Sequence, residues 1–227
     1  MGLEHEWWLD EVAHAGHEHL DPTYVAGYDA KSQTDWDETV ATLRAAGVGL
    51  SSTVVDLGAG TGTFARSIAP YVKRVVAADP SPAMVSAMHA RGIDAIQAGF
   101  LSYRHEGDPP DAVFTRNALH HLPDYWKAIA LGRVAQLLRP GGVLLIEDIV
   151  FSFEPGDADT AIESWLASAP ADPSSGWTAA QLAEHVRTEF STFTWILEAM
   201  LVRVGFEVRD RWTSSNQIYA AFTCVRL

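Results

Sequence analysis

Cysteine and long apolar runs are nearly absent from this chain of 227 residues. The one cysteine, Cys224, has no partner within the chain, which excludes a disulfide framework, and we interpret it as a small buried apolar residue. No run approaches the about 18 consecutive apolar residues that span a bilayer, and the first residues are acidic where a secretory signal would be basic. We therefore expect a cytoplasmic protein with no membrane partner.

Basic residues are also scarce. The sequence has 16 Lys and Arg against 29 Asp and Glu, which gives a formal net charge of -13. Binding to nucleic acid requires clustered cations that neutralise phosphates, so this balance predicts no nucleic-acid partner and favours a small-molecule substrate. The length and the 48% content of hydrophobic residues suffice for one domain with a full core.

The most informative segment is residues 54–62, VVDLGAGTG, where an apolar run ends in an acid and three glycines follow at alternate positions. This pattern predicts a strand that leads into a turn whose backbone can approach a ligand closely, because glycine has no Cβ. Dinucleotide sites use G-x-G-x-x-G, whereas this segment reads D-x-G-x-G-x-G. Its candidate ligand-binding residues are Asp56, Gly58, Ala59, Gly60 and Gly62.

A second acidic strand end follows. Residues 74–78 predict a strand that ends on Asp79, where a parallel arrangement would bring the carboxylate beside the glycine turn. Asp79 could then accept hydrogen bonds from both hydroxyls of a ribose, as nicotinamide-dinucleotide enzymes also do. Ser81 and Pro82 are predicted as the N-cap and first position of the next helix, which directs Met84 toward the ligand.

Two further segments continue the pattern. Residues 111–116 predict a strand whose C-terminal end opens into a polar loop, residues 117–124 (NALHHLPD), and ligands of open α/β sheets lie at such ends. Residues 138–142, LRPGG, end a helix and lead into a buried strand that finishes at Asp148.

Taken in order, these segments resemble four motifs of the class I S-adenosylmethionine-dependent methyltransferases: D-x-G-x-G-x-G, D-x-S-x-x-M, N-x-L-H-H-L-x-D and L-x-P-G-G. The resemblance covers residues 54–150 and, more loosely, two strands after them. It implies S-adenosylmethionine as cofactor and methyl transfer to an O, N or C atom of a small-molecule acceptor. Within the family, the chain is most similar to the ubiquinone/menaquinone-type enzymes. The resemblance places at the cofactor, besides the glycine turn, Asp79, Pro80, Ser81, Met84 and Asn117.

One departure from the family follows the third predicted strand. Many relatives place Gly-Asp there, but this chain reads QAGF over residues 97–100. The adenine amino group would lose a carboxylate partner, so we expect backbone atoms of Gly99 and Phe100, with the Phe100 ring, to hold the adenine. Gln97 is the alternative.

The resemblance implies a doubly wound α/β fold. We expect a seven-stranded, mostly parallel sheet with an antiparallel C-terminal hairpin, N-terminal helices and a helical insertion after the fifth strand. Residues 1–35 would form an N-terminal helical lid and residues 36–227 the methyltransferase domain, in which residues 152–200 form a helical substrate cap.

Three local predictions refine this frame. Residues 36–47 have the apolar spacing of a helix that precedes the first strand. Thr178 and Gln181 have the spacing of a capping box. Residues 205–208 and 217–222 are predicted as the strands of the terminal hairpin.

The lid region holds aromatic residues and histidines. Tyr24 and Tyr28 lie one helical turn apart, and the resemblance implies that Tyr28 lies near the methionyl carboxylate or the sulfonium. The pattern H-x-x-H-x-H over residues 14–19 invites a metal site, but a helix would place its last two histidines on different faces, and no cysteine is nearby. We predict no metal site.

Methyl transfer from a sulfonium is an in-line displacement, which depends on alignment in a dry site and needs no catalytic metal. An acceptor that must lose a proton requires a base with a pKa near the working pH. His120 is the predicted general base, with Asp148 and Glu147 as competing acids at the next strand end.

Two other classes of protein remain open. A nicotinamide-dependent oxidoreductase would share the glycine turn and Asp79, but it should show G-x-G-x-x-G. A non-catalytic S-adenosylmethionine-binding protein would lack an acceptor pocket, whereas the aromatic residues of the 152–200 insertion favour one. A homodimer is a further prediction.

Overall fold

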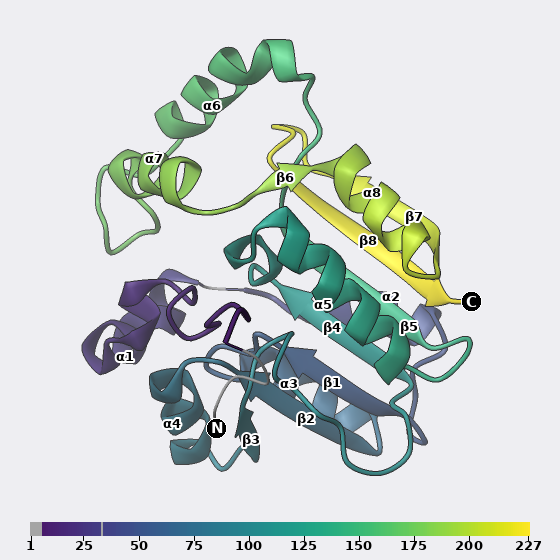
Figure 1. Cartoon of the computed structure of the whole chain (residues 1–227). Helices are drawn as coiled ribbons and strands as arrows, with labels where there is room; N and C mark the ends of the chain where they lie inside the picture. Colours follow the sequence, from purple (N-terminus) through teal and green to yellow (C-terminus); the bar gives the residue numbers. More distant parts are fainter. Residues whose placement is uncertain (1–5, 33) are drawn as a thin grey trace.

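The computed structural model describes residues 6–32 and 34–227 (Figure 1). Its centre is a sheet with the strand order β3-β2-β1-β4-β5-β8-β7. These strands are β1 (Thr53–Leu57), β2 (Arg74–Asp79), β3 (Ala95–Gln97), β4 (Ala112–Arg116), β5 (Val143–Phe151), β7 (Phe206–Thr213) and β8 (Tyr219–Arg226). The first five pair in parallel, and β8 is antiparallel to both of its neighbours. The predicted mostly parallel sheet with an antiparallel hairpin is confirmed.

Helices cover both faces of this sheet (Figure 1). They are α1 (Pro22–Lys31), α2 (Asp37–Ala45), α3 (Thr63–Ile68), α4 (Pro82–Ala90), α5 (Asp124–Leu137), α6 (Ala158–Ala167), α7 (Ala179–Thr188) and α8 (Thr194–Arg203). Short 3-10 turns are η1 (His17–Leu20), η2 (Ala69–Tyr71), η3 (Leu119–His121) and η4 (Pro155–Asp157). Because successive strand residues point to opposite faces, Val55 packs in one core cluster with α5 and α8, whereas Val54 packs in another with α2 and α3.

The local start signals read from the sequence are present. The Ser81 side chain accepts a hydrogen bond from the Met84 amide and caps α4, and Pro82 is the first residue of that helix. Thr178 and Gln181 form the predicted capping box at the start of α7. The helix predicted over residues 36–47 is α2.

The insertion after β5 divides into two parts. Helices α6 and α7 stand away from the sheet and pack on each other (Figure 1), and a two-residue strand, β6 (Thr192–Phe193), pairs in parallel with the end of β5. This extra strand was not predicted. Helix α8 returns to the sheet, because Leu197 and Leu201 are fully buried in the main core. Residues 152–193 therefore leave the sheet except at β6, while α8 belongs to the layer that covers it.

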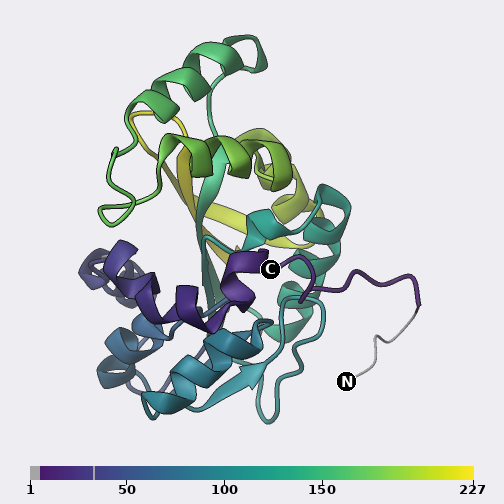
Figure 2. The ribbon, with the colours of Figure 1, turned by 90° about the vertical axis from the view of Figure 1, so that its left-hand side faces the viewer.

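The hairpin strands β7 and β8 run past their predicted C-terminal ends, to Thr213 and Arg226, and begin slightly later than predicted; a register shift lies between Val208 and Asp210. Cys224 is fully buried on β8, as predicted. The N-terminal elements η1 and α1 lie against α4, as the view turned by 90° also shows (Figure 2). Among the residues described, no helix combines the length and apolar character needed to cross a membrane.

Candidate active site

A pocket opens at the carboxyl ends of the parallel strands, where the chain leaves β1 toward one side and β4 toward the other. It is lined by Glu11, His14, Ala15, His19, Tyr28, Gly58, Gly60, Asp79, Pro80, Met84, Phe100, Arg116, Asn117, Ala118, His121 and Leu122. The predicted cofactor residues in this lining are Tyr28, Gly58, Gly60, Asp79, Pro80, Met84, Phe100 and Asn117. The predicted cofactor residues outside it are Asp56, Ala59, Gly62, Ser81 and Gly99.

The glycines of the first turn have three different surroundings. Gly58 has φ 74°, and a Cβ added to it would lie 2.3 Å from the Cβ of Ala118, so this turn fits against the loop after β4 only with glycine. A Cβ on Gly60 would meet no atom within 4 Å, consistent with its place in the pocket wall. Gly62 instead packs against Ile93, which a Cβ would approach to 2.6 Å.

Asp79 is held in place by backbone amides. Its Oδ2 accepts a hydrogen bond from the Gly60 amide at 2.8 Å, and its Oδ1 accepts one from the Ser81 amide at 2.9 Å. Burial raises the pKa of Asp79 to about 6, although these two amides oppose the shift. A carboxylate can accept about four hydrogen bonds, so Asp79 keeps acceptor capacity toward the pocket.

Asp56 lies behind the pocket wall on β1. Its Oδ2 is buried without a hydrogen-bond partner in the described part of the chain. Burial, and then the charge of Asp79, raise the pKa of Asp56 well above its ordinary value. A buried polar atom without a partner is costly, and the raised pKa reflects that cost, because the neutral carboxyl is easier to bury than the carboxylate.

Ser81 supports the pocket without lining it. Its Oγ donates a hydrogen bond to the His19 carbonyl at 2.7 Å as well as capping α4. This bond ties the N-terminal segment to the start of α4. The residues on either side of the cap, Pro80 and Met84, do line the pocket.

Glu11 is a pocket residue that sequence reasoning missed. Its carboxylate accepts hydrogen bonds from the Leu101 amide at 2.9 Å and from the Ser102 amide and hydroxyl at 2.9 and 2.7 Å. A Cβ on Gly99 would lie 2.3 Å from this carboxylate, so Gly99 makes room for Glu11 and does not line the pocket. No local pattern marks this contact, because the partners lie about 90 residues apart in the chain.

Helix α1, which lies in the region predicted as a lid, is fastened beside the glycine turn. Its Tyr28 lines the pocket edge-on to His19, with ring centroids 5.7 Å apart, and burial raises the pKa of Tyr28 to about 12. The next residue, Asp29, accepts a hydrogen bond from the Thr61 hydroxyl at 2.5 Å and forms an ion pair with Arg91 at 2.7 Å.

The end of β4 supplies the opposite wall. Asn117 has φ 48°, a left-handed conformation that asparagine tolerates better than most residues, and its amide donates a hydrogen bond to the Glu147 carbonyl. The Glu147 carboxylate accepts a hydrogen bond from Thr39 at 2.8 Å and pairs with Arg116 at 3.1 Å. Glu147 is therefore engaged on the other side of the sheet end and does not line the pocket.

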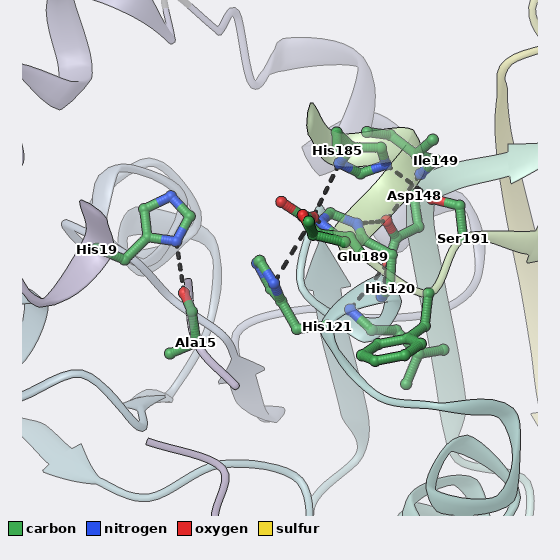
Figure 3. Close-up of polar contacts among 12 residues, drawn as sticks. Ala15, His19, His120, His121, Asp148, Ile149, His185, Glu189 and Ser191 are labelled. Atoms are coloured by element: carbon green, nitrogen blue, oxygen red, sulfur yellow. Dashed lines mark hydrogen bonds and ion pairs between the residues drawn. The ribbon is translucent and has the colours of Figure 1, made fainter. Parts of the chain in front are cut away.

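His120 and Asp148 form a buried pair (Figure 3). Asp148 contacts the Nδ1 of His120 and accepts hydrogen bonds from the Leu119 and His120 amides at 2.8 and 3.2 Å. The other ring nitrogen, Nε2, lies 2.9 Å from Oε2 of Glu189. Burial opposes protonation of this ring, but Asp148 and then Glu189 outweigh it and raise the pKa of His120 to about 9. His120 does not line the pocket.

His121 takes the place in the pocket that was predicted for its neighbour. The two rings lie close together, with centroids 4.4 Å apart, but only His121 lines the pocket. Burial, and then the charge of His120, lower the pKa of His121 to about 3. The ring also lies edge-on to His19, with centroids 5.6 Å apart.

Other residues of this region had a weak signal in the sequence. His185 and Glu189 have the i, i+4 spacing of one helix face, and both lie beside His120. The lining also includes neighbours of Asn117 in the chain, namely Arg116, Ala118 and Leu122. Their place could have been predicted, because they lie at the end of β4, where the pocket opens.

Comparison with known proteins agrees with the sequence motifs. Residues 28–209 match a family described as methyltransferase domain. An uncharacterized methyltransferase of Anoxybacillus flavithermus is 29% identical over 186 residues, which cover 81% of this chain and 83% of the relative. A second uncharacterized methyltransferase, from Exiguobacterium sibiricum, is 29% identical over 190 residues, which cover 81% of this chain and 82% of the relative.

Solved structures share the fold. Magnesium protoporphyrin IX methyltransferase of Synechocystis, crystallised with S-adenosylmethionine, aligns with a TM-score of 0.65 and 15% identity over 98% of this chain and 100% of that one. The cyclopropane synthase MmaA2 of Mycobacterium tuberculosis aligns with a TM-score of 0.63 and 15% identity over 97% of this chain and 95% of that one. At such identities the likeness is one of fold.

Proposed function

Because the chain belongs to the methyltransferase domain family, we propose that it transfers a methyl group from S-adenosylmethionine to a small-molecule acceptor. The observation that carries the proposal is Asp79, a buried carboxylate held by the glycine turn with its free acceptor capacity facing a pocket. Proteins of the same fold have been crystallised with S-adenosylmethionine or its demethylated product, which supports the choice of cofactor.

The pocket residues fit this cofactor. Asp79 would accept hydrogen bonds from the ribose hydroxyls, and Gly60 leaves the space in which the cofactor can approach the backbone. Pro80, Met84 and Phe100 give the apolar walls that an adenine ring needs.

Glu11 supports the adenine side in an unusual way. The family's carboxylate after the third strand is absent from this sequence, but the Glu11 carboxylate lies against residues 99–102 and lines the pocket. We propose that the N-terminal segment supplies the acid that this loop lacks. Gln97, the alternative considered from the sequence, donates its hydrogen bond to the Pro80 carbonyl and lies outside the pocket lining.

When bound, S-adenosylmethionine supplies a sulfonium methyl for in-line displacement. The contribution of the chain is to align the acceptor and to exclude water. Tyr28 and Asn117 would hold the polar methionine end, and the lid segment that carries Tyr28 would close the pocket from outside. His121, His14 and Arg116 remain in the wall to contact the acceptor.

The predicted general base, His120, does not reach the pocket, because both of its ring nitrogens contact carboxylates. We propose that His121 contacts the acceptor instead, and that Asp148 serves to fix His120 and the turn η3 behind it. A small acceptor suits the net charge of -13, and the cap residues 152–193 would cover it. A homodimer stays a prediction.

The experiment is calorimetric titration of the purified protein with S-adenosylhomocysteine and, separately, with NAD. We expect saturable one-to-one binding of S-adenosylhomocysteine and none of NAD. Asp79→Ala should weaken binding at least about tenfold, since it removes hydrogen bonds from a charged acceptor. The matched control is Asp94→Ala, which alters an exposed aspartate near α4 and should bind as the wild type does. Binding of NAD alone, or of neither compound, would overturn the proposal.

A further inference from the structure

Three side chains from two distant parts of the chain converge between the cap and the sheet. His120 lies in η3 after β4, His185 lies in the last turn of α7, and Glu189 is the C-cap residue of α7. Figure 3 shows the two imidazoles and the carboxylate directed at one point. Their nearest nitrogen and oxygen atoms all lie within 4.8 Å of one another, and His120 is fully buried.

One oxygen is the centre of this group. Oε2 of Glu189 lies 2.9 Å from Nε2 of His120 and 2.8 Å from Nδ1 of His185. It is nevertheless buried with no hydrogen-bond partner in the described part of the chain. Two nitrogens therefore approach the oxygen without the alignment of a hydrogen bond, as donors around a shared cation do.

The far nitrogen of each ring is held by another residue. Nδ1 of His120 contacts the Asp148 carboxylate, and Nε2 of His185 lies 2.8 Å from the Ser191 hydroxyl. With Nδ1 against Asp148, Nε2 is the nitrogen of His120 that faces Glu189. A histidine whose second nitrogen contacts a carboxylate is the arrangement found in carboxylate–histidine–metal arrays.

The dimensions suit a small divalent ion. Bonds of about 2.0–2.1 Å in a tetrahedral site place neighbouring ligand atoms roughly 3.4 Å apart. The observed distances from Oε2 of Glu189 to the two histidine nitrogens are 2.8 and 2.9 Å. They need to widen by only about half an ångström, which a side-chain rotation in Glu189 can supply. Nδ1 of His121 lies 3.7 Å from the same oxygen, so a fourth donor is within reach.

We propose that His120, His185 and Glu189 bind one divalent transition-metal ion, with zinc as the best match to this nitrogen and oxygen donor set. The ion would join α7 of the cap to the turn after β4, next to the acceptor side of the pocket. The ion would have a structural role, and methyl transfer would not depend on it. The inference is independent of the proposed function.

The surroundings already hold the same two segments together. The Phe190 amide donates a hydrogen bond to the His120 carbonyl at 2.9 Å, and the buried Lys127 contacts the Phe190 carbonyl. Thr192 donates a hydrogen bond to Asp124 at 3.2 Å. A metal at Glu189 would extend this connection by one helical turn into α7.

The test is metal binding by protein freed of metal with a chelator. We expect calorimetry to give one zinc ion per chain, and cobalt(II) to give the visible ligand-field bands of a low-symmetry site with nitrogen ligands. His185→Ala should weaken zinc binding on the order of 100-fold, and Asp148→Asn about tenfold. Hydrogen exchange should slow in α7 when zinc is added to the wild type.

Two variants serve as controls. His89→Ala removes a histidine of α4 that bonds the Ala95 carbonyl, and His14→Ala removes a member of the N-terminal histidine pattern; both should bind zinc as the wild type does. Glu189→Gln, checked for folding by circular dichroism, provides a second ligand variant. Absence of stoichiometric binding in the wild type would overturn the proposal, as would unchanged affinity in both ligand variants. Binding of S-adenosylhomocysteine by the same samples tests the methyltransferase proposal separately.

Discussion

At the scale of single residues, Asp79 shows how a binding site opposes stability. Burial disfavours its ionised form, and the hydrogen bonds from the Ser81 and Gly60 amides and the nearby His19 only partly offset this. Its pKa rises from the ordinary 3.8 to about 6, so the folded state binds a proton that the unfolded state releases. The contribution of Asp79 to the free energy of unfolding is therefore fully present below pH 3.8, and it is lost as the pH rises through about 6.

The prediction concerns the protein without cofactor. As the pH falls from about 7 to 4.5, the wild type should gain about 2 kcal/mol of unfolding free energy relative to Asp79→Asn, which does not titrate. Urea unfolding of both proteins across this range measures the difference. Parallel stability curves would contradict the assignment of the shift to Asp79.

Gly58 illustrates a residue fixed by a close approach. Gly58→Ala should cost about 1–2 kcal/mol for the positive φ and about 1–3 kcal/mol more for contact with Ala118. Gly47→Ala is the matched control, since Gly47 has φ 96° but open space where a Cβ would lie. Thermal or urea unfolding should show the larger loss in Gly58→Ala, and adding Ala118→Gly should restore part of it. Equal losses at both glycines would show that the contact is unimportant.

At the scale of elements, helix α1 of the proposed lid is joined to the glycine turn through one side chain, Asp29. Asp29 joins it to Thr61 and Arg91, and its side chain and that of Arg91 are about one third exposed. Partly exposed pairs contribute about 0.2–1 kcal/mol, which is little for the whole protein but enough to change how often one helix detaches.

Asp29→Asn should therefore raise the hydrogen-exchange rate of α1 up to about fivefold while global stability changes by less than about 1 kcal/mol. Affinity for S-adenosylhomocysteine should fall by a similar factor, because Tyr28 of α1 lines the pocket. Exchange measured by mass spectrometry gives the result for each segment. Asp108→Asn, at an exposed loop position, is the control. Unchanged exchange in α1 would mean that other contacts hold the lid.

At the scale of the whole molecule, the sequence was sufficient for what local rules determine. The strand that ends in the glycine turn, the acid at the end of β2 and the caps of α4 and α7 each depend on residues within a few positions of one another. Their order along the chain then fixed the sheet, because parallel strands joined by helices have few topologies available.

What the sequence could not determine depends on distant parts of the chain. The Glu11 contact with residues 101 and 102, and the approach of Glu189 to His120, join segments that no periodicity relates. The choice between His120 and His121 at the pocket was also undecidable, because adjacent residues of a short turn point in directions set by its surroundings. That α8 packs on the sheet was not foreseen either, because this helix is apolar enough to lie in a cap or in the core.

The position of β8 has a consequence for how the chain is made. β8 follows β7 in sequence, yet it lies between β5 and β7 in the sheet. A ribosome that adds about 5–20 residues per second completes β5 several seconds before residues 219–226 emerge. During that interval the nascent chain carries an apolar strand with one unpaired edge, which is the kind of edge that pairs with other chains. The growing polypeptide is therefore expected to need a chaperone at this stage, or slow synthesis at low temperature, more than the finished protein does.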